Sequence, residues 1–289
     1  MIRIPKLSSQ QIILFTVLSL ATILIAWQLA QILPTGIDWQ QTYRPAARRL
    51  LTGKNPYTEP AVPETPFVAA PWSLIPLLPF AVLPEQLGNA CLFLLAIFIF
   101  AMSVKKLGGN IFAIVIFILT PPVITSLLYS NIEWMPLIGF VLPPQIGLFF
   151  ISTKPQTGFA VAIFWLYQAW RQGGVKEVVR VFGPFLAVLG LSFLIFGFWP
   201  ATSYGVINVA GDLNASLWPA SIPIGLGLLV ASLRKRDIGY AMGASPCLSP
   251  YVLLHAWSGA LMAIVSLPYE TVIVVAALWG LVLMRGLGS

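Results

Sequence analysis

The sequence has little charge. Of its 289 residues only 9% are Asp, Glu, Lys or Arg, whereas a soluble domain carries roughly a quarter. Hydrophobic residues make up 58% and the mean hydropathy is +0.89. These values exclude a soluble globular protein. The net charge of +7 does not indicate a nucleic-acid partner, because the 16 Lys and Arg residues are spread over loops, where they orient membrane spans.

Cysteine and histidine are scarce as well. Cys91 and Cys247 lie far apart in apolar stretches and are interpreted as small hydrophobic side chains. No cluster of acidic or histidine ligands is present, so no metal site and no cofactor are expected.

Long runs without Asp, Glu, Lys or Arg fill most of the chain. Each is long enough to cross a bilayer as a helix, which takes about 20 residues. The runs are 7–37, 107–132, 134–153, 181–211, 213–233 and 238–269. We therefore expect an all-α polytopic membrane protein with about 9 to 11 membrane segments. Residues 1–289 form a single integral membrane domain: a first span within 1–33, an external loop at 34–65, and the remaining spans at 66–289.

The basic residues predict which loops lie in the cytoplasm. Arg3 and Lys6 precede the first span, which places its start inside and the loop 34–65 outside. Five apolar blocks, at 66–84, 86–104, 111–129, 133–152 and 156–170, then bring Arg171, Lys176 and Arg180 to the cytoplasm. This count also places four acids inside: Glu85, Glu133, Glu177 and Asp237.

The same count places Lys105, Lys106 and Lys154 outside, which the positive-inside rule disfavours. At least one block is therefore expected to be re-entrant. The prolines of 66–84 and of 137–170 point to these two segments, because broken helices at membrane depth usually line cavities.

The loop 34–65 holds seven of the 25 charged residues. Residues 38–53 predict a short amphipathic helix at the membrane interface. Asp38 or Thr42 can cap its start, Pro45 suits its first turn, and Gly53 suits its end. One interpretation is a surface anchor whose arginines meet lipid headgroups.

A second interpretation assigns chemistry to this loop. Asp38 follows the first span directly and can act as a general base towards a hydroxyl. The guanidinium groups of Arg44, Arg48 and Arg49 suit the phosphate of a lipid-linked donor. Asp38 as a helix cap or an arginine partner remains the alternative. Asp212 is the second candidate acid, although a turn role suits it equally.

Two further residues are candidates beyond the loop. His255 is the one histidine and lies in an apolar stretch, where an ionisable residue is a functional candidate. The alternative is a ring hydrogen-bonded to a neighbouring helix. Lys154 can bind the donor phosphate, or it is a boundary lysine that extends to the membrane surface.

Three patches of sequence resemble glycosyltransferase family 87. The first is D-W-x-x-x-Y-x-x-A-A-x-x-L-L-x-G-x-N-P-Y at 38–57, followed by a proline-rich block at 71–84. The others are Lys154-Pro155-Gln156 and Ser249-Pro250-Tyr251 with His255. The chain departs from the family at 253–257, where the Trp and Tyr around the histidine are displaced or replaced. The family's Gly-Gln-x-Asn segment is represented only by Ser130-Asn131.

The resemblance implies a GT-C fold and a function. It implies an inverting transfer of a mannose-like sugar from a polyprenyl-phosphate donor to a lipid or glycan acceptor, on the outer face of a bacterial plasma membrane. Asp38 would be the base, assisted by His255 or with His255 facing the donor phosphate; Tyr43, Asn55 and Tyr57 of the first patch would contact acceptor or sugar. The competing expectations are a catalytically silent GT-C-like subunit and a transporter of lipid-linked sugars.

Overall fold

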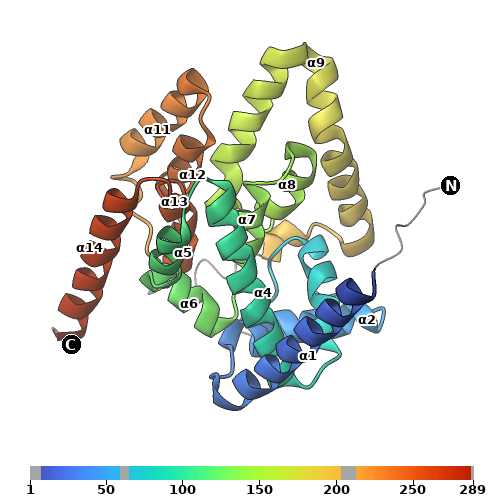
Figure 1. The fold of residues 1–289 in the computed structure, drawn as a ribbon. Helices are drawn as coiled ribbons and strands as arrows, with labels where there is room; N and C mark the ends of the chain where they lie inside the picture. The colour runs from blue at the N-terminus through green and yellow to red at the C-terminus, as the bar shows by residue number, and fades with distance from the viewer. Residues whose placement is uncertain (1–7, 59–64, 203–212, 288–289) are drawn as a thin grey trace.

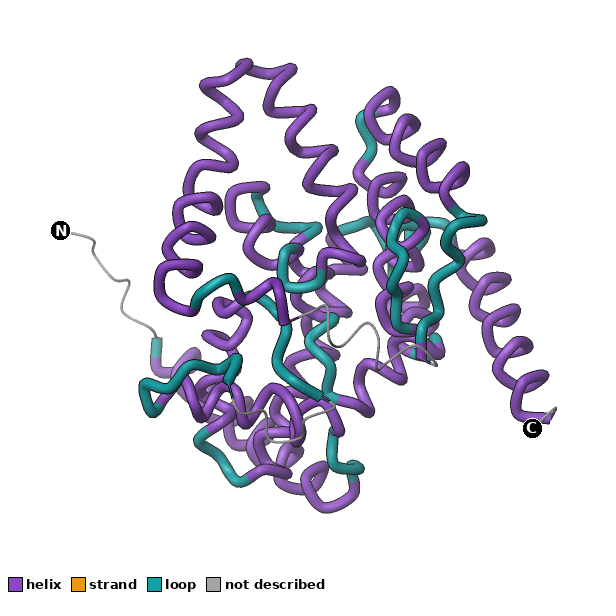
Figure 2. Tube along the Cα trace, turned by 180° about the vertical axis from the view of Figure 1, so that it is seen from behind, coloured by secondary structure: helices purple, strands orange, loops and turns teal. Residues whose placement is uncertain are grey.

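The computed structural model describes residues 8–58, 65–202 and 213–287, and their regular structure is helical throughout (Figures 1 and 2). The all-α prediction is therefore confirmed for this part of the chain. The longer helices are α1 (Ser9–Ile32), α4 (Glu85–Lys106), α9 (Pro155–Phe196), α11 (Ile222–Lys235), α12 (Ile238–Cys247) and α14 (Pro268–Leu287). The shorter ones are η1 (Trp39–Tyr43), α2 (Arg44–Leu51), η2 (Pro71–Leu77), α3 (Leu78–Ala81), α5 (Ile111–Ile118), α6 (Pro121–Tyr129), α7 (Trp134–Gly139), α8 (Pro144–Ile151), η3 (Trp199–Ala201), η5 (Leu254–Trp257) and α13 (Ser258–Met262).

Two helices of the described chain, α4 and α9, are long and apolar enough to cross a membrane. The pair α5 and α6 makes a third if it counts as one span, although it is bent by 66°. Helix α9 has 42 residues and is not straight, because Gly173 and Gly174 have non-helical backbone angles. Figure 1 shows the two arms of α9 meeting at this kink, at the top of the molecule.

Prolines divide the other apolar blocks into short helices. Thr120 caps α6, whose first residues are Pro121 and Pro122. Pro144 begins α8 and Pro155 begins α9, so residues 133–170 do not form one continuous helix. Each proline lacks an N–H and fits a first helical turn, where that donor is not needed. The two segments that the sequence marks as broken, 66–84 and 137–170, are therefore broken in the structure.

The short helices α7 and α8 pack closely because they meet through glycine. A Cβ on Gly147 of α8 would lie 2.6 Å from the carbonyl oxygen of Gly139 on α7 and 2.6 Å from the ring of Trp165. The chain consequently turns back between α7 and α8, and α8 packs against α9.

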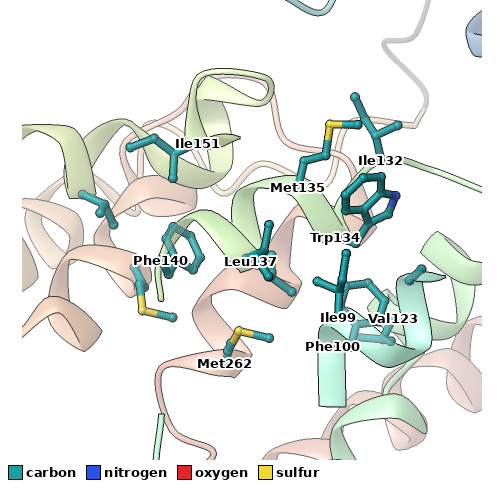
Figure 3. Close-up of a cluster of buried hydrophobic side chains, with 14 of the residues drawn as sticks. Ile99, Phe100, Val123, Ile132, Trp134, Met135, Leu137, Phe140, Ile151 and Met262 are labelled. Carbon is teal, nitrogen blue, oxygen red and sulfur yellow. The ribbon is translucent and has the colours of Figure 1, made fainter. Parts of the chain in front are cut away.

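The hydrophobic core lies where α4, α6, α7, α8 and α13 meet. Figure 3 shows Phe100, Ile132, Trp134, Leu137 and Met262 within one cluster of buried side chains. Ile132 and Trp134 are 1% and 4% exposed, and both are neighbours of Glu133 in the sequence. Their burial draws the carboxylate between them into the interior.

The segment 66–84 does not lead away from the loop that begins at residue 34. The hydroxyl of Tyr57 donates to the carbonyl oxygen of Ala69 (2.8 Å), and Arg44 donates to that of Leu83 (3.2 Å). Arg44 also pairs with Glu85 at 3.2 Å. Glu85 thus lies at the same end of the molecule as Arg44, and Lys105 and Lys106 lie at the far end of α4. The assignment of Glu85 to the opposite side was wrong, because 66–84 returns where a crossing had been counted.

The remaining basic clusters lie at the other end of the molecule. Arg171, Lys176 and Arg180 flank the kink of α9, and Arg234, Lys235 and Arg236 occupy the turn between α11 and α12. Figures 1 and 2 both show the kink and this turn at the top, while Figure 1 shows α2 in the lower part.

Candidate functional site

Asp38 lies between α1 and η1, in a helical turn, and is half-buried. Its carboxylate does not cap a helix, contrary to the N-cap alternative. Instead, Oδ2 accepts a hydrogen bond from the Nδ2 amide of Asn131, which follows α6. No other hydrogen bond from the described residues reaches this carboxylate.

A second polar contact fixes the backbone around Asp38. Asn89 of α4 donates to the carbonyl oxygen of Pro34 (3.0 Å) and accepts from the hydroxyl of Ser130. Ser130 has a left-handed backbone conformation, with φ of 52°. Gly36 faces it so closely that a Cβ there would lie 2.3 Å from the Ser130 hydroxyl oxygen. The turn after α1 is thus held against the end of α6.

Glu133, Lys154 and His255 form a buried group beside Asn131. The Nζ of Lys154 lies 3.1 Å from Oε2 of Glu133 and 2.9 Å from Nε2 of His255. The hydroxyl of Thr157 donates to Oε1 of Glu133 (2.7 Å). The exposed fractions are 0% for Glu133, 6% for Lys154 and 4% for His255. We call these four residues the buried charge cluster.

Three chain segments supply this cluster and its neighbour Asn131. Glu133 lies between α6 and α7, Lys154 is the N-cap residue of α9, and His255 belongs to η5. A buried charge is tolerated where it is paired and hydrogen-bonded, and these three side chains supply each other's partners. Residues that are 101 positions apart in the chain, Lys154 and His255, are joined directly.

Asp38 lies within electrostatic reach of the buried charge cluster. Burial raises the pKa of its carboxyl above the ordinary value, while the hydrogen bond from Asn131 and the positive charge of Lys154 oppose that rise. Burial and the charges of Asp38 and Glu133 also raise the pKa of Tyr43 well above its usual value. Asp38, Lys154 and His255, all candidates from the sequence, therefore belong to one region, and Tyr43 borders it.

The arginines of the loop lie elsewhere. Arg44 is engaged by Glu85. Arg49 donates to the carbonyl oxygen of Asn55 (3.2 Å) and to the hydroxyl of Thr58 (3.1 Å). Arg48 is exposed. The structure does not bring these guanidinium groups to Asp38, and Arg44 and Arg49 stabilise the loop itself.

The loop helix is close to its predicted form. Residues 39–43 are a π-helix and 44–51 an α-helix with Pro45 in its first turn, and Gly53 ends it with φ of 71°. Thr42 does not cap its start, since its hydroxyl donates to the carbonyl oxygen of Thr65 (3.0 Å). Ala46 and Ala47 face the core, whereas Leu51 is 48% exposed.

Asn55 and Tyr57 fasten the loop to the end of α9. Asn55 accepts from the backbone N–H of Tyr57 (3.0 Å) and donates to the carbonyl oxygen of Phe196 (3.4 Å). The ring of Tyr57 stacks on Trp199, with centroids 5.9 Å apart. Both side chains are therefore engaged by the protein, and their contact with acceptor or sugar stays a prediction. Asp212, the second candidate acid, lies outside the described residues.

Sequence reasoning missed Glu133 as a site residue. It was assigned to the opposite side, yet it contacts Lys154 and lies two residues from Asn131, the partner of Asp38. The assignment was wrong for the same reason as that of Glu85: the segment 66–84 returns, so every later side in the count was shifted by one crossing. A signal was present: Glu133 is the single charge between two charge-free runs, and such a residue is a functional candidate. The alternative for Lys154 as an extended boundary lysine was also wrong, since its ammonium is buried and paired.

Within the described residues, no group of three His, Cys, Asp or Glu side chains is placed to hold a metal ion. No family model matches the chain, and neither a curated protein nor a solved structure matches it. The likeness to glycosyltransferase family 87 therefore rests on the sequence patches alone.

Proposed function

We propose that this protein is a membrane glycosyltransferase that moves a sugar from a polyprenyl-phosphate donor to a hydroxyl of a lipid or glycan acceptor. The observation that carries the proposal is the half-buried carboxylate of Asp38, which is oriented by Asn131 and lies within electrostatic reach of the ammonium of Lys154. A base in the field of a cation suits a reaction in which a hydroxyl attacks and a phosphate leaves.

The surface of the described chain supports a membrane location. Large apolar side chains such as Ile111 and Leu194 are 80% and 85% exposed. Contiguous apolar surface of this kind requires a cover, which lipid tails supply. Along α1, the second arm of α9 and α14, exposed apolar residues recur over most of each helix.

The basic residues support an orientation in this membrane. The kink of α9 and the α11–α12 turn carry two basic clusters at one end, which the positive-inside rule assigns to the cytoplasm. Glu85 begins α4 at the side of the molecule where Asp38 lies, and Lys105 and Lys106 lie at the opposite end of this helix. With 66–84 re-entrant, these two lysines no longer conflict with the rule. Asp38 then belongs to the outer face.

The proposed reaction needs one base. Asp38 takes the proton of the acceptor hydroxyl, whose oxygen attacks the anomeric carbon of the sugar. The bond between this carbon and the phosphate oxygen breaks, and the phosphate leaves with the electron pair on the polyprenyl chain. The configuration inverts. Because a phosphate leaves without being protonated, no second carboxylic acid is required, unlike in glycosidases.

Lys154 and His255 are the groups assigned to the phosphate. An ammonium lowers the energy of the leaving phosphate by charge, and an imidazole N–H does so by hydrogen bonding. Membership of the GT-C superfamily and a mannose-like sugar on a polyprenyl carrier follow from the sequence resemblance.

The experiment is sugar transfer by the purified protein in lipid nanodiscs, from polyprenyl-phosphate-mannose and a panel of related donors to a glycolipid acceptor. Asp38→Asn should lower the transfer rate about 10²- to 10⁴-fold, as loss of a general base does. Asp237→Asn is the matched control: Asp237 caps α12 through the N–H of Gly239 (2.8 Å), a role asparagine also fills.

Two outcomes would overturn the proposal. Transfer at the same rate by Asp38→Asn and by Asp237→Asn would remove Asp38 from the reaction. Absence of transfer by the unmutated protein with every donor would favour the silent subunit, and movement of intact donor across the vesicle membrane would favour the transporter.

A further inference from the structure

Glu133 has no part in the proposed reaction, yet it is the most deeply buried charge in the described chain. Its carboxylate is 0% exposed and contacts two donors, the ammonium of Lys154 and the hydroxyl of Thr157. Oε1 accepts a hydrogen bond from Thr157, whereas Oε2 accepts none and lies 3.1 Å from the ammonium nitrogen of Lys154. A buried oxygen that has no hydrogen bond but lies this close to a cation is balanced by charge, which requires the ionised carboxylate.

An ionised Glu133 determines the state of Lys154. An ammonium buried at 8% side-chain exposure is stable only with a counter-charge, and Glu133 supplies it at 3.1 Å. Lys154 in this state has three N–H donors and no lone pair.

The charged Lys154 in turn determines which nitrogen of His255 carries the proton. The Nζ of Lys154 lies 2.9 Å from Nε2 of His255. Because an ammonium cannot accept a hydrogen bond, Nε2 must be the acceptor, and the proton of the neutral ring then resides on Nδ1.

We infer that Glu133 is a positioning residue that, through Lys154, holds His255 in the Nδ1–H tautomer, so that His255 is a hydrogen-bond donor to the ligand and not a base. The lone pair of Nε2 is occupied by Lys154, and Nδ1 has its proton already. The ring therefore has no free lone pair with which to take a proton from an acceptor hydroxyl.

Asp38 and His255 then have different roles at the site. Proton removal is left to the carboxylate of Asp38, while His255 offers an N–H to an anionic group such as a phosphate oxygen. The tautomer is independent of the proposed function, but its use in binding the donor phosphate rests on that function.

The test uses the fact that His255 is the one histidine of the chain. Protein labelled with ¹⁵N-histidine and purified without a histidine tag gives the ring signals of this residue alone, so no assignment is needed. In the unmutated protein at neutral pH we expect a protonated Nδ1 and an unprotonated Nε2. A protonated Nε2 would overturn the inference directly, without any variant.

Glu133→Gln tests the positioning role. Without its counter-charge the buried ammonium of Lys154 is expected to release its proton, after which the amine can accept from Nε2–H, and the single Nδ1–H signal should be lost. Glu133→Asp keeps the charge and should retain it. Glu177→Gln is the matched control, because Glu177 is paired with Arg180 near the kink of α9, away from this cluster. An unchanged Nδ1–H signal in Glu133→Gln would show that Glu133 does not hold the tautomer.

The glycosyltransferase function and the tautomer of His255 can each be overturned without the other. An Nδ1–H tautomer that depends on Glu133, in a protein that transfers no sugar, would overturn the glycosyltransferase function and leave the inference standing. Transfer that depends on Asp38, together with an Nε2–H tautomer, would do the reverse. If both hold, Glu133→Gln should lower the transfer rate at least about tenfold, and Glu133→Asp should restore part of it.

Discussion

Glu133 and Lys154 form a buried ion pair. Removing one partner is expected to destabilise the protein far more than removing both partners together. The carboxylate is 0% exposed and the lysine side chain 8% exposed, so either charge left alone cannot be hydrated. Removing one partner of such a pair costs about 3–5 kcal/mol, because the other remains as an uncompensated buried charge. With a melting temperature that falls about 2–4 °C per kcal/mol, Lys154→Met should melt roughly 6–20 °C below the unmutated protein.

The assay is a double-mutant cycle of Glu133→Gln, Lys154→Met and both together, followed by thermal unfolding in one detergent. Intrinsic fluorescence reports unfolding, since the chain has ten tryptophans. A single scan rate is used throughout, because unfolding of membrane proteins is often irreversible. The double variant should melt above Lys154→Met, because it leaves neither charge unpaired.

The matched control is the pair of Glu177 and Arg180 on the second arm of α9, in which the side chain of Arg180 is 66% exposed and that of Glu177 18%. Arg180→Met should leave the melting temperature unchanged, because water and ions screen charges at such a position. Strictly additive losses in the Glu133 and Lys154 cycle would refute the reasoning, since additivity means that the two charges do not interact.

Three further predictions follow from other contacts. Asn131→Ala removes the hydrogen bond that lowers the pKa of Asp38, so this pKa should rise. Because Asp38 acts in its ionised form, the acidic limb of the pH–rate profile for sugar transfer should move to higher pH. An unmoved limb would contradict the assignment of Asp38 as the base. Gly147→Ala places a Cβ 2.6 Å from a carbonyl oxygen of α7 and should cost about 1–3 kcal/mol, whereas Gly190→Ala, with open space around it, should cost nothing in the same thermal melt. Tyr57→Phe loses one hydrogen bond to a backbone carbonyl at 2.8 Å while keeping its aromatic stack, so unfolding should become easier by about 1 kcal/mol, and a larger loss would mean that the loop itself had detached.

Local rules predicted the local structure of the chain. Pro45, Pro144 and Pro155 begin helices, and Gly53 ends one, because the constraints on proline and glycine act within a single turn. The absence of charge predicted helices throughout. The choice of Asp38 as a candidate also followed from its place next to α1 in a loop rich in charge.

The wrong predictions concern the side of the molecule on which a loop lies, because this side depends on whether each preceding segment crosses or turns back. Counting 66–84 as a crossing assigned Glu85 to the wrong end, and the same miscount carried over to Glu133. Hydropathy records how apolar a segment is and not whether it crosses or turns back, so one miscounted block reverses the side of the next loop.

By itself, the sequence determined that this is a helical, charge-poor chain, where its helices break, and that Asp38, Lys154 and His255 are its chemical candidates. Only the tertiary structure decided that Lys154 and His255 touch, that Asn131 holds Asp38, and that Glu133 balances the lysine. The physical reason is that composition and proline act over a few residues, whereas a buried charge depends on partners from distant segments, whose meeting is set by how the broken helices fold back on one another.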